Sequence, residues 1–171
     1  LQGQLETGDK IELRPGIRVE KQHKAAYEPL LTDIVSLHAG GRKVKEARCG
    51  GLVGIGTLLD PALTKADGLT GNMVGKPSGL PPTRSELTLE VQLFERAVGT
   101  KEMIKIEPVR TGERILLHVG TTITMGTVTS AQKDTVTLEL GRPVCTEEGS
   151  RAALSRRIAA RWRLVGYGVI K

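Results

Sequence analysis

Apolar and polar residues alternate one by one through several short segments of this chain, and glycine or proline separates these segments. Between Leu87 and Leu93 every second residue is leucine or valine, with threonine, glutamate and glutamine between them. Successive side chains of a β-strand point to opposite faces, so this alternation predicts a strand with one buried face. Val136, Leu138 and Leu140 repeat the pattern. The sequence therefore predicts an all-β fold.

The same criterion predicts further strands along the whole chain. They are residues 9–14, 30–38, 43–48, 52–59, 113–119, 121–130, 135–140, 152–158 and 161–170. Pro15-Gly16 is expected to end the first strand in a turn, and Asp60 is expected to cap a single helical turn that starts with Pro61.

The length and composition of the chain allow one moderate core or two small ones. The 171 residues include 21 glycines but only four aromatic residues, so valine, isoleucine and leucine must fill the interior. Gly79-Leu80-Pro81-Pro82 is the best boundary, because two adjacent prolines cannot donate to a sheet ladder. We predict two domains, residues 1–81 and 82–171.

Charge and targeting signals narrow the classes of partner. The formal net charge of +6 permits an anionic partner such as a nucleic acid, although a solvated basic face explains it equally well. No apolar run approaches the ~20 residues that span a bilayer, which favours a cytoplasmic protein without a membrane partner. Cys49 and Cys145 are expected to be free thiols.

Catalytic and metal-binding patterns are absent from the sequence. Thr64-Lys65-Ala66-Asp67 imitates the guanine-reading motif of GTPases, but no phosphate-binding loop precedes it, so we interpret it as the end of a helical turn. The histidines at 23, 38 and 118 have no spacing suited to a metal. We expect no catalytic residue, no bound metal and no cofactor in this chain.

Two groups of longer motifs resemble one known family. The first is residues 50–57, GGLVGIGT, followed by LLDPALTKAD at 58–67. The second is RPVCT at 142–146, ALSRR at 153–157 and RWRLVGYG at 161–168. These stretches are similar to the two C-terminal domains of translation initiation factor 2 gamma subunits of archaea and eukaryotes, which are relatives of elongation factor Tu.

The resemblance implies two small antiparallel β-barrels in tandem, like domains II and III of elongation factor Tu. Family members begin the first barrel before the position of Leu1, so its first strands are expected to be missing here. The family hydrolyses GTP with Mg²⁺ on a separate domain, and this chain contains no such domain; as supplied it is expected not to be an enzyme.

The resemblance also implies binding partners: initiator Met-tRNA, the alpha subunit of the heterotrimer and the small ribosomal subunit. In relatives, the second domain holds the terminal adenosine and amino acid of tRNA. The positions expected to bind tRNA here are Arg14, Ile17, Arg18, Lys21, Asp33, Ile34, Gly54, Ile55 and Gly56. The basic members of this set are expected in a loop after the first strand, where Lys24 joins them. For Gly54 and Gly56, a role in barrel curvature alone is an equally good interpretation.

A denser basic cluster lies near the C terminus. Its members Arg156, Arg157, Arg161 and Arg163 are interpreted as contacts to RNA or to another domain, with a solvated role for some of them. Two other hypotheses stay open: the chain is a pair of accessory barrels from another GTPase like elongation factor Tu, or it is a scaffold that binds only proteins.

Overall fold

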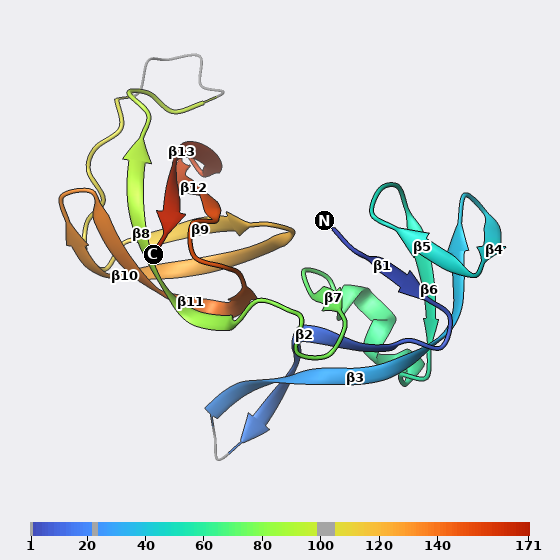
Figure 1. The fold of residues 1–171 in the computed structure, drawn as a ribbon. Helices are drawn as coiled ribbons and strands as arrows, with labels where there is room; N and C mark the ends of the chain where they lie inside the picture. Colours follow the sequence, from blue (N-terminus) through green and yellow to red (C-terminus); the bar gives the residue numbers. More distant parts are fainter. Residues whose placement is uncertain (1, 22–23, 99–104) are drawn as a thin grey trace. The chain divides into compact units, whose positions relative to one another are not determined.

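The chain forms two compact units, Leu1–Leu80 (unit 1) and Pro81–Lys171 (unit 2). The computed structural model describes residues 2–21, 24–98 and 105–171, without the side chains of residues 21, 24 and 25 (Figure 1). Each unit consists of antiparallel strands. The prediction of an all-β fold is therefore confirmed.

Unit 1 is a curled half-barrel built around one long strand, β3. Its elements are β1 (Gln4–Glu6), β2 (Lys10–Lys21), β3 (Lys24–Ala39), β4 (Arg42–Val44), β5 (Glu46–Arg48), β6 (Val53–Thr57), η1 (Pro61–Asp67) and β7 (Met73–Gly75). The main sheet has the order β4-β3-β2-β7, and β6 also pairs with β3, outside this order. β1 and β5 form a separate two-stranded sheet.

Among the described residues of unit 1, the buried hydrophobic core is aliphatic. Ile11 and Leu13 from β2 are buried together with Ile34 and Leu37 from β3 and Ala47 from β5. Half-buried side chains from β6 and from the turns around η1 pack against them. Burial of such side chains stabilises the fold by ~1.5–3 kcal/mol each.

β2 does not end at Pro15-Gly16, so the predicted turn and the predicted basic loop are both wrong. The strand continues to Lys21 and pairs with β3 on both sides of the dipeptide, with Leu13 opposite Leu30 and Ile17 opposite Glu28. Pro15-Gly16 is an irregularity inside a hairpin. The basic residues that follow it therefore lie on strands.

Gly16 allows β2 and β3 to approach closely at this irregularity. Its φ is +90°, and a Cβ atom added there would lie 1.7 Å from the carbonyl oxygen of Glu28. The Gly16 N–H donates to Asn72 Oδ1 at 2.7 Å, which ties the irregularity to the segment before β7. Only glycine fits this backbone position.

The expected helical turn is present as η1. The Asp60 side chain accepts a hydrogen bond from the Ala62 N–H at 2.8 Å, and Pro61 is the first helical residue. Residues 64–67 end this turn, with Ala66 and Asp67 at positive φ.

Unit 2 is a closed six-stranded barrel. Its strands are β8 (Thr83–Leu93), β9 (Arg114–Val119), β10 (Thr122–Gln132), β11 (Thr135–Cys145), β12 (Arg151–Ile158) and β13 (Arg161–Ile170). They close in the order β10-β11-β8-β13-β12-β9, and β9 pairs with β10. The alternating residues of β8 and β11 point into the barrel, with Leu89 and Leu138 fully buried.

We predict that Gly16→Ala destabilises unit 1 by about 2–4 kcal/mol, because the new methyl group meets a backbone oxygen in a conformation that alanine avoids. The measurement is the free energy of unfolding in urea. Gly54→Ala is the matched control, since its Cβ would lie 3.6 Å from His38 Cβ, an ordinary contact. Equal stability of the two variants would contradict this account of Gly16.

Candidate functional site

The residues predicted to bind tRNA all lie on three neighbouring strands of unit 1. β2 carries the group around Arg18, β3 carries Asp33 and Ile34, and β6 carries Gly54–Gly56. β3 lies between the other two strands and pairs with both. The sheet therefore orders the predicted residues into one surface region.

Within this region the residues form two groups. Arg18 is opposite Tyr27 of β3, whereas Thr57, next to the glycines, is opposite Ile34. Strand geometry places Tyr27 and Ile34 roughly 20 Å apart along β3. One small ligand cannot contact both groups, but a strand of several nucleotides can.

Two of the predicted side chains belong to the core. Ile34 is buried, with 2% of its surface exposed, and Ile55 packs half-buried against the same cluster. Their side chains hold β6 against β3. A ligand on the outer surface would meet the neighbouring residues instead.

Gly54 and Gly56 face outward, but they differ in how much room surrounds them. A Cβ atom at Gly56 would lie 2.4 Å from Ser36 Oγ, so the Ser36 hydroxyl would have to rotate away to make room for it. Gly54 has only an ordinary contact with His38. Of the two, Gly54 has the smaller packing role.

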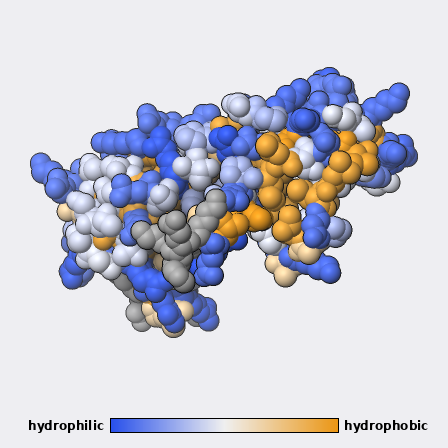
Figure 2. Space-filling view, turned by 90° about the horizontal axis from the view of Figure 1, so that it is seen from below, coloured by the Kyte–Doolittle hydropathy of each residue, from blue (hydrophilic) through white to orange (hydrophobic). Residues whose placement is uncertain are grey.

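Exposed apolar side chains lie on the same outer region and were not predicted from the sequence. Leu31 is 67% exposed, Val35 52% and Leu58 71%. Figure 2 shows hydrophobic residues gathered on the surface of unit 1. The adjacent apolar pairs Leu30-Leu31 and Ile34-Val35 could have indicated them. Neighbours in a strand point to opposite faces, so one member of each pair must point away from the core.

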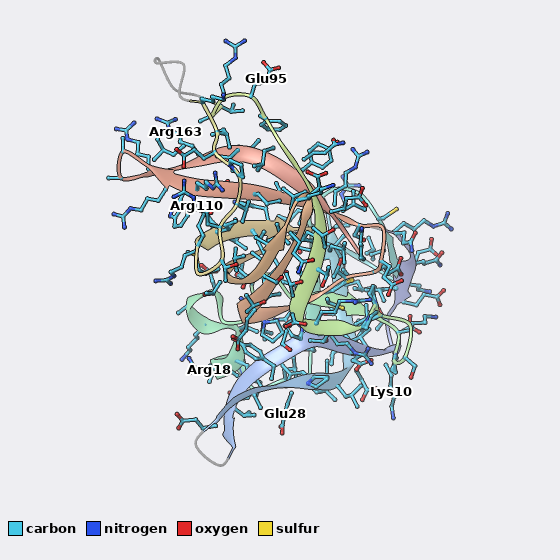
Figure 3. The ribbon with its side chains drawn as sticks, turned by 90° about the vertical axis from the view of Figure 1, so that its left-hand side faces the viewer. Lys10, Arg18, Glu28, Glu95, Arg110 and Arg163 are labelled. Carbon is cyan, nitrogen blue, oxygen red and sulfur yellow. The ribbon has the colours of Figure 1, made fainter. Side chains whose placement is uncertain are left out.

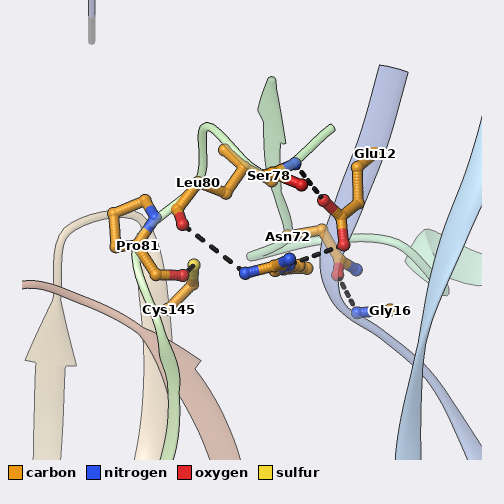
Figure 4. Close-up of polar contacts among 8 residues, drawn as sticks. Glu12, Gly16, Asn72, Ser78, Leu80, Pro81 and Cys145 are labelled. Carbon is orange, nitrogen blue, oxygen red and sulfur yellow. Dashed lines mark hydrogen bonds and ion pairs between the residues drawn. The ribbon is translucent and has the colours of Figure 1, made fainter. Parts of the chain in front are cut away.

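Arg14 is held by unit 1 itself, through Glu12 and Leu80, which are labelled in Figure 4. Its Nε donates to Glu12 Oε1 at 2.7 Å, and its Nη1 lies 3.5 Å from the carbonyl oxygen of Leu80. The other carboxylate oxygen of Glu12 accepts from the Ser78 N–H at 3.2 Å. The Glu12–Arg14 pair thus fastens residues 78–80 to β2.

The environment of Glu12 lowers the pKa of its carboxyl group below the ordinary value of 4.5. The hydrogen bond from the Arg14 side chain is the main cause, and the Ser78 N–H acts in the same direction. Burial acts against them because it disfavours the charged form.

Arg18 differs from Arg14, because its side chain is exposed and no ion pair to it is found in the described part of the chain (Figure 3). It lies on the hairpin formed by β2 and β3, opposite Tyr27. The Lys21 side chain lies outside the described residues, as does that of Lys24. Among the described side chains of this group, Arg18 is thus the cation without a carboxylate partner.

The predicted C-terminal arginines lie on the β12–β13 hairpin of unit 2, and the structure divides them. Arg156 Nε is 2.6 Å from Glu113 Oε1, and its guanidinium also donates to the Glu107 carbonyl oxygen. Arg157 and Arg161 are exposed, and Arg163 is half-buried. Arg156 is therefore a structural residue of unit 2.

The other polar candidates form no chemical centre in the described part of the chain. No group of three histidine, cysteine or carboxylate side chains there is arranged to hold a metal ion. Cys49 is exposed and Cys145 is buried, and neither forms a disulfide bond within the described residues. His38 and His118 are exposed strand residues, and His23 lies outside the described residues.

Comparison with known proteins identifies the family. Residues 85–170 match the family described as the C-terminal part of initiation factor eIF2 gamma. The chain belongs to this family. The match covers almost all of unit 2, including the hairpin that carries the arginines.

Relatives extend the similarity over all 171 residues. The chain is 58% identical to translation initiation factor 2 subunit gamma of Methanopyrus kandleri, 57% to that of Thermococcus kodakarensis and 52% to that of Methanocaldococcus jannaschii. Each alignment covers 100% of this chain and 41–42% of the relative. The chain thus spans about two fifths of the length of these relatives. Among the described residues, no helix has the length and apolar character needed to cross a membrane.

We predict that the stability of unit 1 depends on pH through Glu12. A folded-state pKa below 4.5 means that the contribution of the carboxylate is present above that pH and is lost as the pH falls through the folded-state value. The free energy of unfolding of Glu12→Gln should therefore fall less between about pH 5 and pH 3 than that of the unchanged chain. Denaturant titrations across this pH range measure the difference, and parallel pH profiles would refute it.

Proposed function

We propose that this chain is the tRNA-binding and partner-binding part of a translation initiation factor 2 gamma subunit. In this proposal units 1 and 2 correspond to the second and third domains of that protein. The whole factor delivers initiator Met-tRNA to the small ribosomal subunit in the cytoplasm. GTP and Mg²⁺ belong to a domain outside this sequence, and the chain itself contributes binding surfaces.

Similarity along the whole chain to gamma subunits is the observation that carries this proposal. The geometry of unit 1 also provides a surface that fits tRNA binding. Asp33 and the outward Gly54 lie at one end of it, where the open backbone of β6 admits a nucleobase or ribose. We assign the terminal adenosine of tRNA to this end.

The other end of the surface suits the phosphate backbone. Arg18 is an exposed, unpaired cation in the described part of the chain, and Tyr27 opposite it lies roughly 20 Å along β3 from Asp33 and roughly 30–36 Å from the residues opposite Gly56 and Gly54. Lys21 follows in the same strand. The acceptor strand would run between the two groups, with Arg18 and Lys21 at its phosphates. Arg14 has a supporting role in this arrangement, because Glu12 already neutralises it.

The alpha subunit is the second proposed partner of unit 1. Leu31 and Val35 of β3 and Leu58, directly after β6, expose apolar surface, which is typical of a protein interface. We therefore assign them to the alpha subunit, beside the region assigned to tRNA.

We predict that Arg18→Glu weakens binding of initiator tRNA to the chain about five- to tenfold at low salt and lowers the slope of log affinity against log salt by about 0.7–0.9. The physical reason is the loss of one phosphate contact. Filter binding at several salt concentrations measures both quantities. Lys105→Glu changes an exposed cation of unit 2 by the same charge and is the control; equal losses in both variants would remove the assignment of Arg18.

We predict that the double variant Leu31→Asp, Leu58→Asp abolishes capture of the purified alpha subunit while changing tRNA affinity less than threefold. Buried carboxylates without partners are costly at an apolar interface. Ile123→Asp is the matched control, because Ile123 is a 58% exposed strand residue of unit 2. Undiminished capture by the double variant would move the alpha subunit to another surface.

A further inference from the structure

The entire net charge of the protein resides in its last 22 residues. Residues 150–171 contain five arginines and one lysine but no aspartate or glutamate. Residues 1–149 contain equal numbers of basic and acidic residues, 19 of each. The positive character of the chain is thus concentrated on β12, β13 and the turn between them.

Contacts within unit 2 neutralise part of this charge. Arg156 pairs with Glu113, and Lys171 Nζ lies 3.2 Å from Glu90 Oε2. The Arg151 guanidinium lies over the Tyr167 ring, 5.4 Å from its centroid. No ion pair involves Arg157, Arg161 or Arg163 in the part of the chain that the structure describes. Three arginines near the tip of one hairpin therefore stay available.

An exposed tryptophan lies among these arginines. Trp162 is 41% exposed and pairs across the hairpin with Arg157, so both side chains share one face. Arg161 precedes it at the two-residue turn of Ala159 and Ala160. The hairpin extends outward from the barrel in Figure 3, where Arg163 is labelled. Trp162 and Arg157 thus share one face of a projecting tip, and Arg161 adds a cation at the turn, on the opposite face of the strand.

We propose that the Arg157–Trp162 face of this hairpin binds single-stranded RNA, with an unpaired base stacked on Trp162 and Arg157 at a flanking phosphate, while Arg161 adds positive charge at the turn. Aromatic stacking and arginine contacts are the shared means of single-strand recognition. A protein hot spot of Trp and Arg needs an apolar surround that excludes water, and this tip offers only two alanines and Ile158. The family of translation factors directs the choice to RNA. This inference does not depend on tRNA binding by unit 1.

Trp162 is the only tryptophan of the chain, so its fluorescence reports on this site alone. The test titrates the 171-residue chain with a 12-nucleotide single-stranded RNA and with a blunt duplex of the same length. We expect the single strand to quench the emission of Trp162 and the duplex to quench it little. Unchanged emission at saturating single-stranded RNA overturns the proposal without the need for any variant.

Three variants extend the test by anisotropy of labelled RNA. Trp162→Ala should weaken single-strand binding at least fivefold, and Arg157→Gln should lower the salt slope by about 0.7. Lys133→Gln, at the tip of the β10–β11 hairpin of the same barrel, should change neither quantity. Equal RNA affinity of Trp162→Ala and the unchanged chain overturns the proposal and leaves the hairpin as a protein contact. Arg18→Glu should leave the quenching intact, which separates this site from the one proposed on unit 1.

Discussion

The pairing of β3 with three other strands is the constraint on which unit 1 depends. Along its 16 residues, β3 bonds to β2, then to β4, and on its opposite edge to β6. The register with β6 shifts at Val35, between Ile34 and Ser36. Val35 points outward as the strand neighbour of Ile34, and the irregularity allows Leu37, three residues after Ile34, to be buried as well. The core and the outer surface are thus set by the same few residues.

Much of the fold follows from the sequence because a barrel buries one face of each strand. β8 and β11 alternate clearly, and the structure confirms both strands. The cap at Asp60 is a local interaction, and it was predicted correctly for that reason. The extension of β2 beyond Gly16 was missed, since its stability depends on distant partners, Asn72 and Glu28. No local pattern contains that information.

The candidate surfaces were predicted less completely than the fold. Sequence reasoning found the basic residues but could not separate Arg14 and Arg156, which have carboxylate partners, from Arg18 and Arg157. The Glu12–Arg14 pair was accessible in principle, because residues two apart in a strand share a face. The partner of Arg156 was not, since Glu113 is 43 residues away in the chain. Ion pairs between residues close in sequence can therefore be predicted from a strand pattern, whereas ion pairs between distant residues cannot.

The connector between the units has a practical consequence for dissecting this protein. On one side, Leu80 offers its carbonyl oxygen to Arg14 of unit 1. On the other, the Pro81 carbonyl accepts from the Cys145 thiol at 2.9 Å, and the Pro82 carbonyl accepts from the Thr146 N–H, both in unit 2. The backbone therefore bonds to unit 1 up to Leu80 and to unit 2 from Pro81 onward, so the change of partner occurs across a single peptide bond. A protease site engineered there would release two halves that each retain these anchoring bonds.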